Sequence, residues 1–171
     1  RIEPSVKKAA ASIPPFEDKL REQFGLAESE NDNAPYLDQI MKPALEIRGI
    51  ESARVGKLAR NAIPPTAITT INVRLVKGNE VQKMLDLVEA HIRGQGYHIV
   101  YKEPTDAERR QHARLVKVRR SGGSPGFRTS MDLPIVKWRQ KQAKAVAGDD
   151  LVLMPTMGGT LPLYLFEELF Q

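Results

Sequence analysis

The sequence contains no cysteine, and this absence excludes both a disulfide scaffold and a thiolate metal site. No apolar run approaches the length of a transmembrane span, and the charged, proline-interrupted first residues do not form a signal peptide. We therefore expect a cytoplasmic protein without a membrane partner. The chain begins at Arg1 without a methionine and ends at Gln171 within an apolar helical pattern, which predicts a fragment of a longer protein.

Histidine is also scarce, and this limits metal binding. The three histidines, His91, His98 and His112, have no carboxylate or second histidine at the spacing of metal ligands. His112 also lies among arginines, whose charge disfavours a metal cation. We expect these residues to bind no metal ion or other cofactor.

Basic residues exceed acidic ones, with 26 Lys and Arg against 21 Asp and Glu. Such an excess can indicate nucleic-acid binding, but much of it lies in residues 109–120, and a single basic helix is more often a solvated face. Sheets that bind RNA usually stack bases on aromatic side chains, and the central region has only Tyr97 and Tyr101. We expect no nucleic-acid partner; a basic nucleic-acid-binding module remains the alternative.

The central region, from Ala44 to Tyr101, has the pattern of strand, long loop, strand, helix and strand. Apolar and polar residues alternate over residues 69–75, which is typical of a half-buried strand with Arg74 on its open face. Apolar residues recur at helical spacing over residues 81–92 and predict a helix that covers the other face. These patterns predict a small antiparallel sheet with a helix on one face.

The remaining residues predict a further α/β unit. After residue 127 the sequence predicts a helix that begins at Asp132, a strand at Leu151–Met154 buried on both faces, a glycine loop and a second helix. Ligands of such sheets collect where a strand ends, so the loop after Met154 is a candidate site. The predicted fold class is α/β, with an α+β part built on the small antiparallel sheet.

Four segments divide the chain in this prediction. Residues 1–43 form a helical lead-in and residues 44–120 form the domain around the small sheet. Residues 121–127 are rich in glycine and serine and predict a linker, after which residues 128–171 form the α/β unit.

Several short motifs together resemble one family, the zinc-dependent exopeptidases and amidohydrolases, which includes glutamate carboxypeptidase, aminoacylase and carnosinase-like dipeptidases. Three motifs resemble its lid or dimerisation domain, and the fourth resembles the glycine-pair loop of its catalytic domain. They are Leu45–Ile50, Asn61–Pro64, Asn72–Val76 and Pro155–Pro162.

The resemblance implies that the intact parent cleaves the amide bond of a dipeptide or N-acyl amino acid with a zinc-activated water. It also implies a homodimer formed through the lid domain. Because the metal ligands of the family are missing from this sequence, we expect the fragment itself to be inactive. A non-catalytic scaffold derived from the same fold is another alternative.

The resemblance selects five residues as substrate contacts, each with a structural alternative. Asn61 either contacts the substrate or caps the entry into a strand. Arg74 either holds a substrate carboxylate or pairs with a cross-strand acid. Gly158, Gly159 and Thr160 either bring backbone amides to an anionic substrate or form a tight turn.

Overall fold

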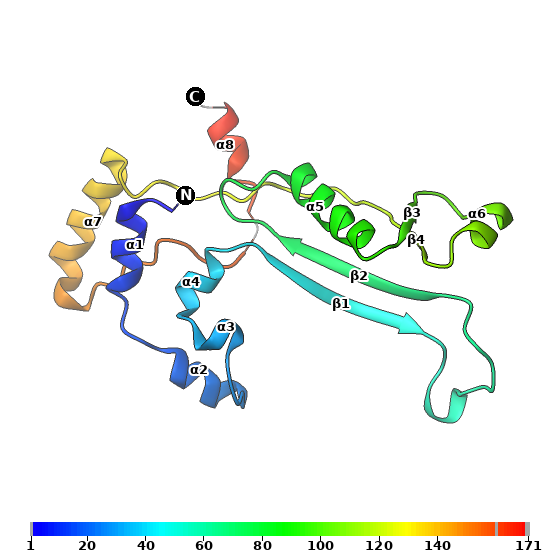
Figure 1. The fold of residues 1–171 in the computed structure, drawn as a ribbon. Coiled ribbons are helices and arrows are strands. Elements are labelled where there is room, and N and C mark those ends of the chain that lie inside the picture. Colours follow the sequence, from blue (N-terminus) through cyan, green and yellow to red (C-terminus); the bar gives the residue numbers. More distant parts are fainter. Residues whose placement is uncertain (1, 160, 170–171) are drawn as a thin grey trace. The chain divides into compact units, whose positions relative to one another are not determined.

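The computed structural model describes residues 2–159 and 161–169, and the chain forms two compact units (Figure 1). The first unit contains Arg1–Lys42, Val76–Gly78 and Ser124–Gln171. The second unit contains Pro43–Leu75 and Asn79–Gly123. The predicted division at residues 43 and 121–127 remains a prediction.

The second unit is built on a long antiparallel hairpin. Strands β1 (Ala44–Ser52) and β2 (Ala67–Arg74) pair so that Leu45 lies opposite Val73 and Ile47 opposite Ile71. The register shifts between Ile47 and Gly49, where β1 carries a bulge. The predicted antiparallel pair of strands is therefore confirmed, although the alternation over residues 69–75 predicted β2 alone.

Helix α5 (Val81–Gly94) follows the hairpin and lies over one side of it in Figure 1. The apolar residues that predicted this helix are all half-buried, while most of its charged residues are exposed. These half-buried residues are Val81, Met84, Leu85, Val88 and Ile92. The predicted amphipathic helix is therefore confirmed.

The third predicted strand does not join the hairpin, and this part of the prediction is wrong. Strand β3 (His98–Val100) instead pairs in parallel with β4 (Leu115–Lys117), and helix α6 (Asp106–Gln111) connects the two. A parallel pair needs a crossover connection, and α6 supplies it. Helix α6 begins with a capping box, in which Thr105 and Glu108 bond each other's backbone N–H groups. The charge of residues 102–120 concealed β4, because its aliphatic run is only a few residues long.

The first unit begins with four short helices, α1 (Pro4–Ala11), α2 (Glu17–Phe24), α3 (Glu30–Asn33) and α4 (Tyr36–Ile40). Pro4 occupies the first turn of α1, where its missing N–H has no partner to lose. Gly25 ends α2 with a φ of 65°, the left-handed conformation that glycine adopts easily.

The core of the first unit is small. Val6 on α1 packs with Leu37 and Met41 at 0%, 5% and 5% exposure. Met131 packs against this core from the second half of the sequence, and Arg128 forms an ion pair with Glu3 at 2.8 Å. The two ends of the chain are thus held in one unit.

The last part of the first unit contains α7 (Pro134–Ala147), the 3-10 helix η2 (Gly148–Asp150) and α8 (Tyr164–Leu169). A second 3-10 helix, η1 (Gly56–Leu58), lies in the second unit. The predicted strand at Leu151–Met154 is not formed. A parallel strand needs neighbours for its N–H and C=O groups, and no described residue pairs with this segment. No helix in the described part of the chain is long and apolar enough to span a membrane.

Candidate functional site

Arg74 lies at the end of β2 and already has an acidic partner. Its Nε donates to Glu46 Oε1 at 2.7 Å, and the amide nitrogen of Asn72 donates to Glu46 Oε2 at 3.2 Å. These bonds from Asn72 and Arg74 lower the pKa of Glu46. The Arg74 and Glu46 side chains remain 58% and 42% exposed. A substrate carboxylate that binds Arg74 must therefore share the guanidinium with Glu46 or displace it.

Asn61 lies in the connection between β1 and β2, residues 53–66, which we call the basic loop. Ala53 and Gly56 have positive φ values of 47° and 61°, and a single 3-10 turn follows at η1. Every residue of the loop is exposed, and Asn61 has no side-chain partner among the described residues. Its amide is therefore free to bind a ligand, and its role as a substrate contact remains a prediction.

Asn61 and Arg74 lie at opposite ends of β2. The strand rises about 3.3 Å per residue, so roughly 23 Å separates Ala67 from Arg74 along it. The basic loop continues beyond Ala67, at the far end of the hairpin in Figure 1. One small substrate cannot contact both residues of the same copy.

The glycine loop belongs to the first unit. Gly158 and Gly159 are exposed, and a Cβ atom added to either would meet nothing within 4 Å. Gly159 has a φ of 151°, a conformation that other residues rarely adopt, so backbone geometry explains this glycine without close packing. Thr160 lies outside the described residues. The predicted contact of this loop with substrate remains a prediction.

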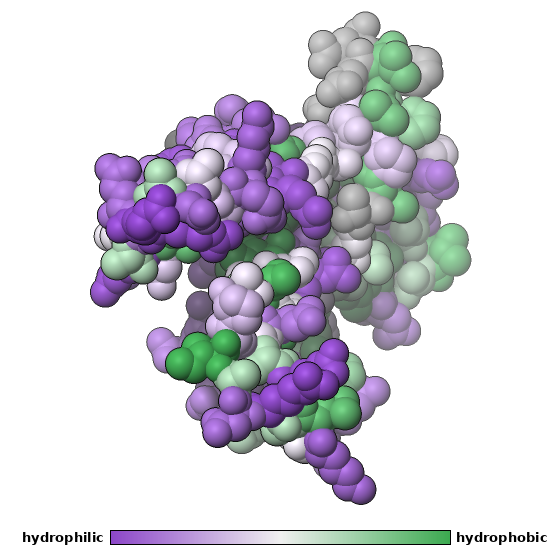
Figure 2. Space-filling model, turned by 90° about the vertical axis from the view of Figure 1, so that its right-hand side faces the viewer, coloured by the Kyte–Doolittle hydropathy of each residue, from purple (hydrophilic) through white to green (hydrophobic). Residues whose placement is uncertain are grey.

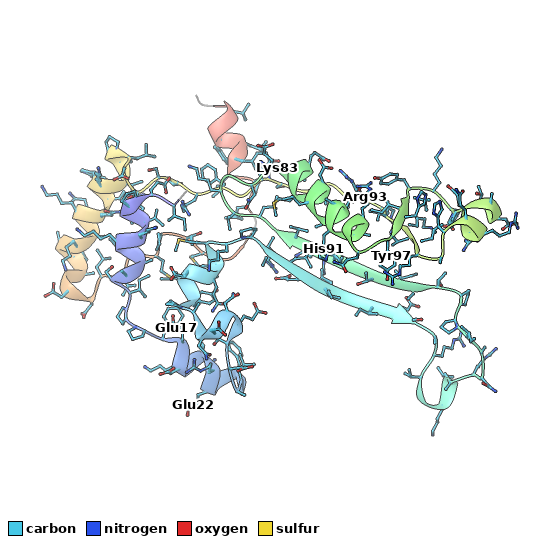
Figure 3. All side chains as sticks on the ribbon, in the orientation of Figure 1. Glu17, Glu22, Lys83, His91, Arg93 and Tyr97 are labelled. Carbon is cyan, nitrogen blue, oxygen red and sulfur yellow. The ribbon has the colours of Figure 1, made fainter. Side chains whose placement is uncertain are left out.

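Glu89 is a buried charge that the sequence patterns did not select. It is the one polar residue buried among the described residues, at 2% exposure. Arg120 Nε donates to Glu89 Oε1 at 2.6 Å, and Tyr101 donates to Oε2 at 2.6 Å. Arg93, labelled on α5 in Figure 3, donates to Oε2 at 3.1 Å. These bonds, that of Arg120 first, lower the pKa of Glu89 to about 2.

Arg120 also reaches Asp86 at 2.7 Å, so it binds two carboxylates of α5. The resulting network fastens the segment after β4 to the helix. All charges in it are compensated within the unit, which identifies it as structural rather than as a site for substrate. An acid at position 89, beside Val88 and in line with Leu85 and Ile92, was the sequence signal for such a network.

The histidines do not form a metal centre. His98 and His112 stack with ring centroids 3.7 Å apart and an angle of 2° between the rings. No group of three or more His, Asp or Glu residues in the described ranges is placed to hold a metal ion. These residues therefore do not fit the zinc centre that the resemblance implies.

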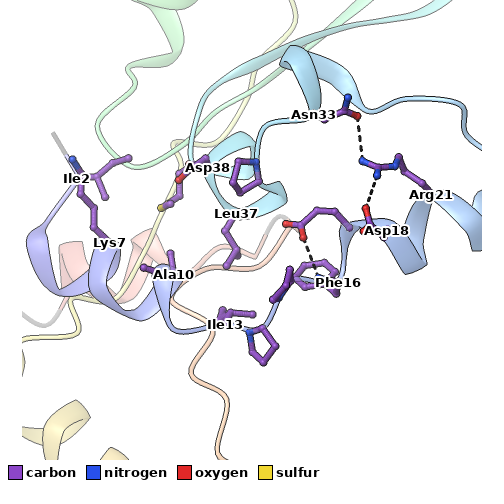
Figure 4. Close-up of a pocket in the computed structure, with 16 residues that line it drawn as sticks. Ile2, Lys7, Ala10, Ile13, Phe16, Asp18, Arg21, Asn33, Leu37 and Asp38 are labelled. Carbon is purple, nitrogen blue, oxygen red and sulfur yellow. Dashed lines mark hydrogen bonds and ion pairs between the residues drawn. The ribbon is translucent and has the colours of Figure 1, made fainter.

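A cavity of about 670 Å³ opens in the first unit, with a largely apolar floor that includes Ile13, Leu37 and Met41 (Figure 4). Two charged residues of its lining bind each other: Arg21 donates to Asp18, and Arg21 also donates to Asn33 at 3.2 Å. None of the predicted site residues lines this cavity.

The hairpin, helix α5 and the short flanking helices define a mixed fold with a small antiparallel sheet, as predicted. A family model described as a peptidase dimerisation domain matches residues 9–99, more than half of the chain. The chain therefore belongs to the M20 peptidase dimerisation-domain family, which confirms the resemblance.

One solved structure with a similar fold is the M20 family metallo-carboxypeptidase Sso-CP2 from Sulfolobus solfataricus. The TM-score is 0.68 at 19% sequence identity, over 97% of this chain and 39% of that one. The chain thus spans about two fifths of the length of this relative. A comparison with curated proteins gave no match.

Proposed function

We propose that this chain is the lid and dimerisation part of a longer metal-dependent peptidase or amidohydrolase. The proposed reaction is hydrolysis of the amide bond of a dipeptide or N-acyl amino acid. The observation that carries this proposal is the match of residues 9–99 to the peptidase dimerisation domain. The fold shared with a metallo-carboxypeptidase supports the same class of reaction.

The role proposed for this chain is to bind and orient the substrate. Arg74 offers guanidinium N–H groups beyond the Nε that binds Glu46, and these suit a substrate carboxylate. Asn61 offers both an amide donor and a carbonyl acceptor. Because β2 separates the two, we propose that Asn61 and Arg74 of one copy contact different substrate molecules. Gly158, Gly159 and Thr160 are proposed to add backbone contacts.

We assign the metal chemistry to none of the described residues, because they do not provide a set of ligands. The resemblance implies zinc in the parent, and its ligands have to come from elsewhere in that protein. We therefore propose that the chain alone does not hydrolyse amides.

We further propose that the second unit self-associates. Its hairpin exposes a row of large apolar side chains on one face, with Leu45, Ile47 and Ile50 at 54%, 62% and 73% exposure. Apolar residues gathered on one element favour burial against a partner surface. A second copy is the partner that the dimerisation family supports.

The test is hydrolysis by the full-length protein of a panel of dipeptides and N-acyl amino acids, with zinc added and then chelated. We expect zinc-dependent turnover, and a loss of about 10- to 100-fold in kcat/KM for Asn61→Ala and for Arg74→Ala. Arg119→Ala removes an exposed arginine of the same unit and is the matched control.

Each outcome has a separate meaning. If both variants turn over substrate at the wild-type rate, the proposed enzyme class stands, but Asn61 and Arg74 are not part of the substrate site. Absence of turnover on every substrate would favour the non-catalytic scaffold. Absence of turnover together with salt-dependent RNA binding would favour the nucleic-acid-binding module.

A further inference from the structure

The basic loop has a composition that the fold does not explain. Residues 53–66 contain Arg54, Lys57 and Arg60 and no acidic residue. The same loop exposes Val55, Leu58 and Ile63 at 85%, 65% and 95%. Figure 2 views this end of the molecule, and apolar and hydrophilic side chains lie side by side at the bottom of the view. Cationic and apolar groups are thus presented together to solvent.

The three cations are also unneutralised. None of them has a hydrogen bond, ion pair or electrostatic partner among the described residues. By contrast, Arg74 is bound to Glu46 and Arg120 to Glu89. A ligand that meets the basic loop therefore finds cations that no carboxylate in the described part of the chain binds.

We propose that the basic loop selects substrates that carry a negatively charged side chain next to the scissile amide. This inference rests on the proposed function, in which Asn61 of the same loop contacts the substrate. Arg54 and Lys57 precede Asn61, and Arg60 is its immediate neighbour. A substrate that reaches the Asn61 amide therefore comes within range of several positive charges.

A small acidic substrate fits these observations better than a nucleic acid does. Single-stranded nucleic acid is held by aromatic side chains that stack on bases, together with cations. The basic loop has no aromatic residue, and its exposed apolar groups are aliphatic. Aliphatic and cationic groups together suit the apolar part and the carboxylate of an acidic amino acid.

The experiment compares kcat/KM of the full-length protein on dipeptide pairs that differ only in glutamate against glutamine, at each position in turn. Replacing a carboxylate by an amide of the same shape isolates the charge. The test variant is R54Q/K57Q/R60Q. The matched control is K83Q/K102Q/R119Q, which removes the same number of exposed cations from the same unit without touching the loop.

We expect the wild type to prefer glutamate over glutamine by about tenfold at low salt, because each exposed cation contributes a small factor. The loop variant should lose the preference, the control should keep it, and R54E/K57E/R60E should reverse it. High salt should weaken the preference in the wild type.

Four results would overturn the inference. Equal turnover of both members of each pair, or a preference that survives in the loop variant, would refute it and leave the proposed function standing. Loss of RNA binding in the loop variant without a change in selectivity would assign the loop to a polyanion. Absence of any amide hydrolysis would refute the proposed function and this inference with it.

Discussion

Replacing Glu89 with glutamine tests whether the buried network stabilises the second unit. The Glu89 carboxylate accepts hydrogen bonds from Arg120, Tyr101 and Arg93, and only 2% of the residue is exposed. These donors, Arg120 foremost, lower its pKa from the ordinary value of 4.5 to about 2. Glutamine keeps the shape of the side chain and removes the charge that they stabilise.

The lowered pKa of Glu89 sets an upper limit to the stability that Glu89→Gln can remove. A lowering from 4.5 to about 2 corresponds to about 3 kcal/mol of stability at neutral pH. Arg93 and Tyr101 are 52% and 57% exposed, so water screens part of the interaction. We therefore expect Glu89→Gln to lower the free energy of unfolding by about 1 to 2 kcal/mol at pH 7.

The pH dependence follows from the sign of the pKa change. A carboxyl group whose pKa is lowered by folding stabilises the folded state above its unfolded pKa of 4.5. That contribution is lost as the pH falls from about 5 toward the folded value of about 2. Glutamine does not titrate, so the difference between wild type and variant should fall to less than half by pH 3.

The assay is urea unfolding followed by far-UV circular dichroism at pH 7 and pH 3. Tryptophan fluorescence is unsuitable, because Trp138 lies in the first unit. Glu103→Gln is the matched control: Glu103 pairs with Lys117 but is 74% exposed, so little change is expected. An equal loss at both pH values, or no loss for Glu89→Gln, would refute the reasoning.

Two further predictions concern packing and self-association. A Cβ at Gly126 would lie 2.3 Å from the carbonyl carbon of Val76. Gly126→Ala should therefore lower the free energy of unfolding by about 1 to 3 kcal/mol, measured by thermal unfolding. Gly122→Ala is the control and should leave stability unchanged, because a Cβ there meets nothing within 4 Å. Ile47→Asp places a charge in the apolar row, where Ile47 is 62% exposed, and should raise the dimer dissociation constant more than tenfold in analytical ultracentrifugation. Leu26→Asp, in the first unit, is the control and should leave the dimer intact. Equal effects of the two substitutions would show that the hairpin does not form the interface.

Local periodicity was sufficient to predict the parts of the fold that depend on neighbouring residues in the sequence. The helical spacing in α5 follows from one half-buried face, whereas β2 forms as its alternation predicted although most of its residues are exposed.

Local periodicity could not predict which distant segments pair with each other. The three-residue strands β3 and β4 are too short to show a period, and the acids and arginines around them resemble a charged helix. The run Leu151–Met154 has the composition of a buried strand, but its state depends on neighbours that the sequence of the run cannot specify. Arg74 illustrates the same limit at the candidate site, since its position on the strand was predicted and its bond to Glu46 was only one of two alternatives.

Arg74 and the three cations of the basic loop have different surroundings, which indicates different roles. Arg74 has Glu46 nearby across the hairpin, so the fold itself supplies a reason for its charge. Arg54, Lys57 and Arg60 are exposed, and exposed cations on one short loop repel one another. Neutral polar residues would keep the basic loop equally soluble without this repulsion. The three charges have no acidic partner among the described residues, which agrees with the anionic substrate proposed for the basic loop.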